Sequence, residues 1–143
     1  MKKIIIYMCI STLALLAFSA QDINKLKKIK VCNNCDFKGA DLSNFDLSNV
    51  EAKGSDFSYA NLQKTNLSNA NLKGAIFANT IFDEVNLSNA ILDDTIVFEQ
   101  NFKSINIEGL NVVNLVIQDS ILTKEQCSYL LSQETRMKNV ICR

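Results

Sequence analysis

The chain has 143 residues, enough for one domain, and 48% of them are hydrophobic, so a substantial core can form. Its 15 basic and 15 acidic residues balance, which argues against a nucleic-acid-binding surface. The sequence contains no histidine, so the commonest general base and the commonest metal ligand are both missing. No nucleophile motif, glycine-rich phosphate loop or metal-ligand cluster is visible, and we therefore expect neither an enzyme nor a cofactor.

The first 20 residues have the form of a signal peptide. A basic pair at residues 2–3 precedes an apolar run over residues 4–18, and small residues allow cleavage after Ser19 or Ala20. The run is shorter than the roughly 20 apolar residues of a membrane span, which favours a cleaved signal over an uncleaved anchor. Cys9 lies inside the run without the small residues that precede a lipid-modified cysteine. We therefore expect no stable membrane anchor after cleavage.

Four cysteines lie beyond residue 20: Cys32, Cys35, Cys127 and Cys142. An even number in an exported chain favours two disulfides, and Cys32–Cys35 and Cys127–Cys142 are preferred because each pair is local to one end. The Cys32-x-x-Cys35 spacing also occurs in redox and metal motifs. A zinc site would need two more ligands without histidine, and a thioredoxin-like site would need a βαβ context that the sequence lacks. A structural disulfide is therefore the preferred interpretation.

The dominant pattern is an internal repeat of five residues. Every fifth residue from Phe37 to Ile117 is apolar; we call these the central residues. The residue before each is mostly Asp or Asn, the residue two before is mostly small or apolar, and the two that follow are mostly polar. The register holds without insertion from Cys35 to Asp119. Neither the helical period nor strand alternation gives a period of five, so the pattern indicates a repeat architecture.

Residues 40–44, 60–64 and 70–74 read ADLSN, ANLQK and ANLKG. They resemble the A-(D/N)-L-x-x consensus of the pentapeptide-repeat family. The resemblance implies an all-β solenoid: a right-handed quadrilateral β-helix of about four coils, with four pentapeptides per coil and short helical caps at both ends. The segment NLSNA at residues 66–70 recurs at residues 86–90, twenty residues later, in agreement with that coil length.

Indexing by twenties assigns the central residues to four faces. Face 1 holds Phe37, Phe57, Phe77, Val97 and Ile117; face 2 holds Leu42, Leu62, Phe82 and Phe102; face 3 holds Leu47, Leu67, Leu87 and Ile107; face 4 holds Ala52, Leu72, Leu92 and Val112. Neighbouring coils should lie about 4.8 Å apart, so the Phe rings of face 1 should stack. Thr65, Thr80 and Thr95 fall inside, which removes the outward threonine columns that ice binding needs. Gln100 also falls inside, where it needs backbone partners.

The ends of a solenoid need caps. Residues 21–34 are the expected N-terminal cap, with an amphipathic helix over 22–31. The repeat domain is expected over residues 35–122, and residues 123–143 form the C-terminal cap. There Thr123 should begin a helix that runs to about Arg136 and sets Leu130 and Leu131 against the last coil, with the tail held by Cys127–Cys142.

Stacking by twenties predicts three exposed ion pairs between coils, each of small energetic value: Lys64–Glu84, Asp83–Lys103 and Lys73–Asp93. Five consecutive outward positions are acidic: Asp36, Asp41, Asp46, Glu51 and Asp56. Successive members point from different faces, so they cannot converge on one metal ion, and no metal site is expected.

Face 1 departs from the Asp/Asn pattern. Its outward column begins with Asp36 and Asp56 and then becomes apolar, and two aromatic residues belong to the same face. The candidate partner surface, called the apolar stripe below, consists of Tyr59, Ile76, Ile96, Phe98 and Val116. Contiguous exposed apolar surface often marks a partner site, although β-branched residues also favour extended backbone for its own sake.

The sequence thus predicts a non-catalytic, exported bacterial protein, periplasmic or secreted, that acts as a scaffold or interaction module. Its partner is an unknown protein or a second copy bound through face 1, and no nucleic acid is expected. The alternative is a DNA-mimicking gyrase inhibitor similar to the quinolone-resistance members of the family, because residues 36–119 hold 12 acidic residues against five lysines. The export signal and the lack of a long acidic column oppose that alternative.

Overall fold

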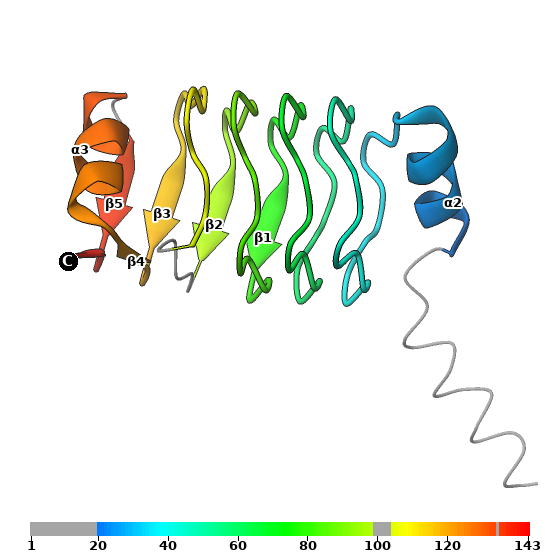
Figure 1. Ribbon diagram of the computed structural model, residues 1–143, viewed down its shortest axis with the longest axis horizontal. Helices are drawn as coiled ribbons and strands as arrows, with labels where there is room; N and C mark the ends of the chain where they lie inside the picture. The colour runs from blue at the N-terminus through cyan, green and yellow to red at the C-terminus, as the bar shows by residue number, and fades with distance from the viewer. Residues whose placement is uncertain (1–19, 99–103, 134) are drawn as a thin grey trace, which may run out of the picture.

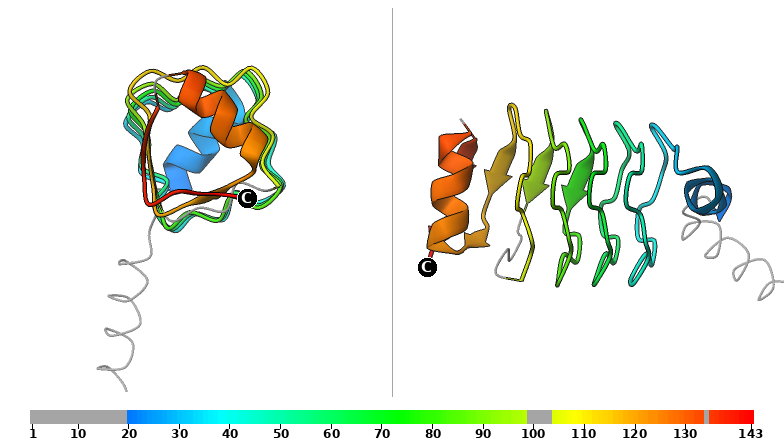
Figure 2. Two further views of the ribbon diagram at one scale, coloured as in Figure 1. Left: turned by 90° about the vertical axis from the view of Figure 1, so that its left-hand side faces the viewer. Right: turned by 45° about the horizontal axis from the view of Figure 1, so that its top comes forward.

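The computed structural model describes residues 20–98, 104–133 and 135–143. Turns of the chain stack side by side along one long axis (Figure 1), and the view along that axis has a square outline (Figure 2). The facing residues of neighbouring turns are parallel and twenty apart in sequence, as in Asn66 with Asn86 and Ile76 with Ile96. The chain is therefore a parallel solenoid with the predicted period.

Within the described residues, one wall forms a four-stranded parallel sheet. It contains β1 (Ile76–Ala78), β2 (Ile96–Phe98), β3 (Val116–Gln118) and β5 (Arg136–Lys138), in that order. The short strands β4 (Ile121–Leu122) and β6 (Ile141–Cys142) pair on the next wall. The other walls pair mostly through single residues, because a turn follows almost every central residue.

Asp and Asn before the central residues hold these turns. Asp46 Oδ1 accepts a hydrogen bond from the backbone N–H of Ser48 at 3.0 Å, and Asn66 Oδ1 accepts one from that of Ser68 at 3.1 Å. This is the Asx turn that short polar side chains form with the backbone two residues on. The turn explains why the repeat prefers Asp and Asn at this position.

Almost every described residue that lies two positions after a central residue has a positive φ. Asn and Gly are common there, as in Asn69 (φ 57°) and Gly74 (φ 69°), because both tolerate the left-handed region. Tyr59 (φ 61°), Lys64 (φ 58°) and Glu84 (φ 56°) adopt the same conformation. Residues of this size are uncommon there.

The core lies inside the square. Phe37, Phe57 and Phe77 are fully buried, and their ring centroids lie 4.9 and 5.1 Å apart in succession, which confirms the predicted stack. Thr65 and Thr80 are also buried, and their hydroxyls donate to the carbonyls of Leu42 at 2.8 Å and Phe57 at 2.9 Å in the neighbouring coil. The inward threonines are thus satisfied by backbone 23 residues away.

A helix lies across each end of the solenoid (Figure 2). Helix α2 (Ala20–Ile29) begins two residues earlier than expected and buries Leu26 against the core. Helix α3 (Lys124–Ser132) begins with the predicted capping box between Thr123 and Gln126 and buries Leu130.

Two expectations about the C-terminal segment are wrong. The helix does not reach Arg136, which lies in β5 and pairs with Val116. Leu131 does not pack on the last coil and is 60% exposed. The reason is that the twenty-residue register resumes after α3, so the tail completes two walls of the solenoid. The helix replaces the chain only where the other two walls would be.

Several expectations concern residues outside the described ones: the first 19 residues of the signal peptide expected over residues 1–20, with Cys9, the inward Gln100 and Phe102, and the Asp83–Lys103 ion pair. In the described part of the chain, no helix has the length and apolar character required to cross a bilayer.

Candidate interaction surface

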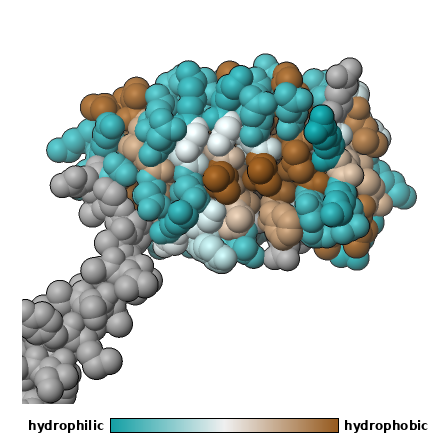
Figure 3. Space-filling model, turned by 180° about the vertical axis from the view of Figure 1, so that it is seen from behind, coloured by the Kyte–Doolittle hydropathy of each residue, from teal (hydrophilic) through white to brown (hydrophobic). Residues whose placement is uncertain are grey.

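The apolar stripe is centred on three strands of face 1. Ile76 faces Ile96 across β1 and β2, and Ile96 faces Val116 across β2 and β3. Ile76 is 40% exposed and Ile96 is 49% exposed, while their neighbours Phe77 and Val97 point into the core. Figure 3 looks onto this side of the molecule, where a hydrophobic row runs along the long axis with hydrophilic residues at both ends.

The other two members of the stripe are placed differently. Phe98 lies in register with Ala78 and Gln118, beside the isoleucine column, and is partly buried. Tyr59 is 67% exposed and lies at the corner that ends the preceding turn, where its backbone N–H donates to the carbonyl of Ala78 at 2.8 Å. Four of the five predicted residues therefore form one continuous surface, and Tyr59 lies beside it.

The backbone accounts for part of this composition. Ile76, Ile96 and Val116 have no side-chain oxygen for an Asx turn, and here the chain is extended over three residues. β-Branched residues suit extended backbone, but threonine suits it equally well and is polar. The extended conformation therefore explains why these side chains are β-branched. It does not explain why they are apolar.

The stripe runs between ends of opposite charge. Asp36 and Asp56 precede it on face 1 with Lys38, whose Nζ lies 2.9 Å from Asp56 Oδ2. Arg136 and Lys138 follow it in β5, and both are exposed. Along the wall the order is acidic, apolar and basic.

The acidic end is held by hydrogen bonds. The bond to Asp56, followed by its charge and that of Asp36, raises the pKa of Lys38. Burial pushes the pKa of Asp56 upward, but hydrogen bonds from Ser58 and Lys38 outweigh it and leave the pKa of Asp56 below its ordinary value. Both groups are therefore charged at neutral pH.

Sequence reasoning missed the basic end of this wall. Counting by twenties from Val116 leads to Arg136, so the signal was present, but the repeat was expected to stop at residue 122. It also missed the exposure of Ile81 and Ile141, each 52% exposed on face 2. Face 1 differs in carrying apolar residues at the outward position in three successive coils.

The ion pairs agree in part with prediction. Lys64 Nζ lies 3.7 Å from Glu84 Oε1, as expected. The Lys73–Asp93 pair is wrong: Lys73 Nζ lies 3.3 Å from Asp94 Oδ2 instead. Asp93 is occupied because its Oδ1 accepts the backbone N–H of Val113 at 2.9 Å.

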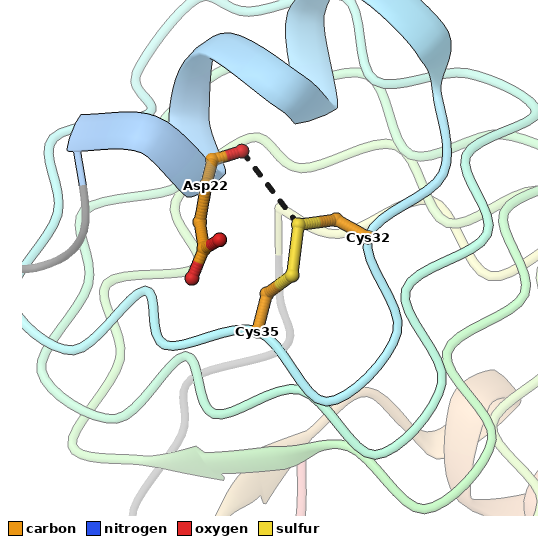
Figure 4. A group of neighbouring side chains, drawn as sticks. All are labelled: Asp22, Cys32 and Cys35. Carbon is orange, nitrogen blue, oxygen red and sulfur yellow. Dashed lines mark hydrogen bonds between the residues drawn. A yellow bond between two sulfur atoms is a disulfide. The ribbon is translucent and has the colours of Figure 1, made fainter.

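The cysteines pair as the sequence order suggests. Cys32 and Cys35 form a disulfide with Cα atoms 5.6 Å apart, and Cys127 and Cys142 form one with Cα atoms 6.0 Å apart. Asp22 of α2 lies beside the first pair (Figure 4), and its carbonyl oxygen is 3.7 Å from Cys32 Sγ. A carboxylate and two sulfurs could together ligate a metal ion, but a bonded sulfur is not the thiolate that binds metals. In this state the cluster joins α2 to the first coil.

These features define a class: a parallel β-solenoid repeat protein, built of five-residue units, that presents its walls to the surroundings. The family model for pentapeptide repeats matches residues 32–69 and 60–96, with eight copies. The chain belongs to the pentapeptide-repeat family. Members of this family form right-handed quadrilateral β-helices, the fold that the resemblance implied.

Solved structures of the family share this fold. The chain is similar to the pentapeptide repeat protein Rfr23 from the cyanobacterium Cyanothece 51142, with 22% identity and a TM-score of 0.69 over 86% of this chain and 94% of that one. It is similar to alr5209 from Nostoc Pcc 7120, with 24% identity and a TM-score of 0.55 over 84% and 95%. QnrB1, a plasmid-mediated fluoroquinolone resistance protein, gives 20% identity and a TM-score of 0.52 over 65% and 52%. No curated protein sequence matches the chain. At these identities the likeness concerns the fold.

Proposed function

We propose that the chain is a non-catalytic interaction protein that binds a protein partner through the apolar stripe on face 1. One observation carries this proposal: Ile76, Ile96 and Val116 follow one another outside the wall in three successive coils. At the same outward position face 3 has Asn66, Asn86 and Asn106.

The polar side chains of the solenoid support a binding role over catalysis. Asn86 Nδ2 donates to Asn66 Oδ1 at 3.2 Å, and Asn86 Oδ1 accepts the backbone N–H of Ser88 at 3.0 Å. Asp41 likewise accepts the N–H of Ser43 and the side chain of Asn61. Side chains engaged in this way stabilise the turns and ladders, and a proton-transfer group would need to reach a substrate.

We also propose that the mature protein is exported from a bacterial cytoplasm to the periplasm or the medium. The form of residues 1–20 supports this, and so do two cysteine pairs at disulfide distance, since such bonds persist in oxidising compartments. Export would separate the protein from gyrase, so the inhibitor alternative, which rests on the acidic excess of residues 36–119, is less well supported.

The experiment is affinity capture from periplasmic extract and culture medium with the immobilised mature protein. A variant with Ile96→Lys and Phe98→Ser should lose the partner that the unaltered protein captures. The matched control is Ile81→Lys, because Ile81 is 52% exposed at the same outward position on face 2. It should retain the partner.

If the altered stripe captures the same proteins and has the same oligomeric state as the unaltered protein, the stripe is not an interaction surface. Thermal unfolding of each variant shows whether a lost partner reflects the stripe or a lost fold, since Phe98 is partly buried.

A further inference from the structure

The charges along face 1 are complementary to those of a second face 1 that runs in the opposite direction. Asp36 and Asp56 lie before the apolar stripe with Lys38, a net charge of −1, and Arg136 and Lys138 lie after it, a net charge of +2. Among the described residues neither Arg136 nor Lys138 has an ion pair within the same molecule. A wall of this kind fits a second wall that runs in the opposite direction.

We infer that face 1 docks a second copy of this chain in an antiparallel, two-fold symmetric dimer with Ile96 and Phe98 on the axis. The inference rests on the proposed function, because it needs face 1 to be an interaction surface, and it names the partner.

The twenty-residue register fixes the contacts of such a dimer. Neighbouring coils lie about 4.8 Å apart, so reversal about Ile96 places Ile76 opposite Val116 of the second copy. The same reversal places Asp56 opposite Arg136 of the second copy. Because a two-fold interface uses the same patch on both chains, every contact away from the axis occurs twice.

Other arrangements of two such walls are less complementary. In a parallel dimer Asp56 would face Asp56 and Arg136 would face Arg136, and like charges opposed across an interface are strongly unfavourable. Reversal about the midpoint between Ile76 and Ile96 would set Asp56 against Val116. Reversal about Ile96 keeps the apolar residues together and opposes unlike charges.

The structure leaves Asp56 able to make this contact. Its Oδ1 accepts the N–H of Ser58 at 2.9 Å and its Oδ2 lies 2.9 Å from Lys38 Nζ, yet 22% of its side chain remains exposed. One wall is narrow compared with the roughly 800 Å² per partner of a standard interface, so the dimer should dissociate in the micromolar range or above.

The test is sedimentation equilibrium of the exported protein, with oxidised cysteines, from low micromolar to near-millimolar concentration. Asp56→Arg and Arg136→Asp should each weaken the dimer by on the order of tenfold or more, because each creates two like-charge contacts. The double variant should restore the dimer, as should an equimolar mixture of the two single variants. Restoration in the double variant also shows that Asp56→Arg allows folding.

Three results would overturn the inference: a monomer at every concentration, a dimer that survives Ile96→Lys with Phe98→Ser, or a double variant as weak as the single ones. The last result would show that the single variants weaken the dimer by a route other than an Asp56–Arg136 contact between copies, so the reversal about Ile96 would be wrong. A monomer that nevertheless loses a captured partner on Ile96→Lys would overturn the second copy as the partner and leave the proposed function standing.

Discussion

Face 1 and face 3 have the same repeat and similar interiors but different exteriors. Inside, face 1 stacks Phe57 on its neighbours and face 3 buries Leu67. Outside, face 3 carries an amide ladder in which Asn66 donates to Asp46 and Asn86 donates to Asn66. Face 1 has no such ladder from Ile76 onward and forms strands instead.

The difference shows that the outward position can change without altering the coil. The central residues fix the period through burial. On face 1 the apolar outward residues Ile76 and Ile96 begin extended strands, whereas a turn follows the apolar outward residue Ile81 on face 2. Face 3 uses that position for its own stability. Face 1 is free to use the outward position for another purpose. The predictions below test this division of roles between the two faces.

The largest loss of stability is expected from substitutions in the core that the two faces share. Phe57→Ala should lower the free energy of unfolding by about 3–5 kcal/mol, and Leu67→Ala by about 2–5 kcal/mol. Phe57 should be the more costly, because its ring stacks on Phe37 and Phe77 and each aromatic pair adds about 0.5–1.5 kcal/mol. Urea unfolding at neutral pH measures both. An equal or smaller loss at Phe57 would show that the stack adds nothing beyond burial.

The next largest effect on stability distinguishes the outward residues of face 3 from those of face 1. Asn86→Ala removes two hydrogen bonds from a half-buried side chain and should cost about 1–2 kcal/mol. Ile96→Thr keeps the β-branched shape at an exposed site and should change stability by less than about 0.5 kcal/mol. The same unfolding experiment compares them. If Ile96→Thr costs as much as Asn86→Ala, the apolar stripe is structural and the division fails.

Much of the fold was predictable because burial repeats with a fixed period. Seventeen apolar central residues in register, from Phe37 to Ile117, fix which side chains point inward, and the Phe stack followed directly. The C-terminal segment was less predictable because a helix interrupts the pattern. The helix takes the place of two repeats of the coil and preserves the count of twenty. Met137 and Cys142 are therefore found in their columns only when the count is carried across the helix.

The candidate site was predictable in its apolar part and missed in its charged part. Ile76, Ile96 and Val116 stand out because they replace Asp or Asn. Arg136 and Lys138 do not stand out, since no repeat consensus surrounds them. The ion-pair error at Lys73 arose because stacking by twenties fixes the backbone register while a long side chain reaches either Asp93 or Asp94.

A smaller effect on stability is expected at the corners between walls, where the backbone φ is positive. Tyr59→Asn should raise the free energy of unfolding by about 1 kcal/mol, because tyrosine at φ 61° is strained where Asn is tolerated. Asn69, at the corresponding corner after face 3, already has the tolerant residue, and Asn69→Tyr should cost a similar amount. Differential scanning calorimetry measures both midpoints. A lower midpoint for Tyr59→Asn would mean that the ring packs on face 1 and belongs to its structure.

The smallest effect concerns the stability of the protein at low pH. Hydrogen bonds from the hydroxyl and the backbone N–H of Ser48 hold the pKa of Asp46 below its ordinary value of 3.8. A carboxyl whose pKa is lower in the folded state stabilises the protein above the unfolded pKa, and this stabilisation is lost as pH falls through the folded pKa. Asp46→Asn keeps an oxygen for the Asx turn but removes the charge, so it should slightly lower stability at pH 7 and reduce the loss of stability below about pH 4. Ile96→Thr replaces no carboxyl and should leave the acid limb of the stability curve unaltered. Thermal midpoints from pH 2 to pH 7 compare the two variants with the unaltered protein, and an identical acid limb in Asp46→Asn would show that the Asx carboxylate of face 3 gains nothing from its charge.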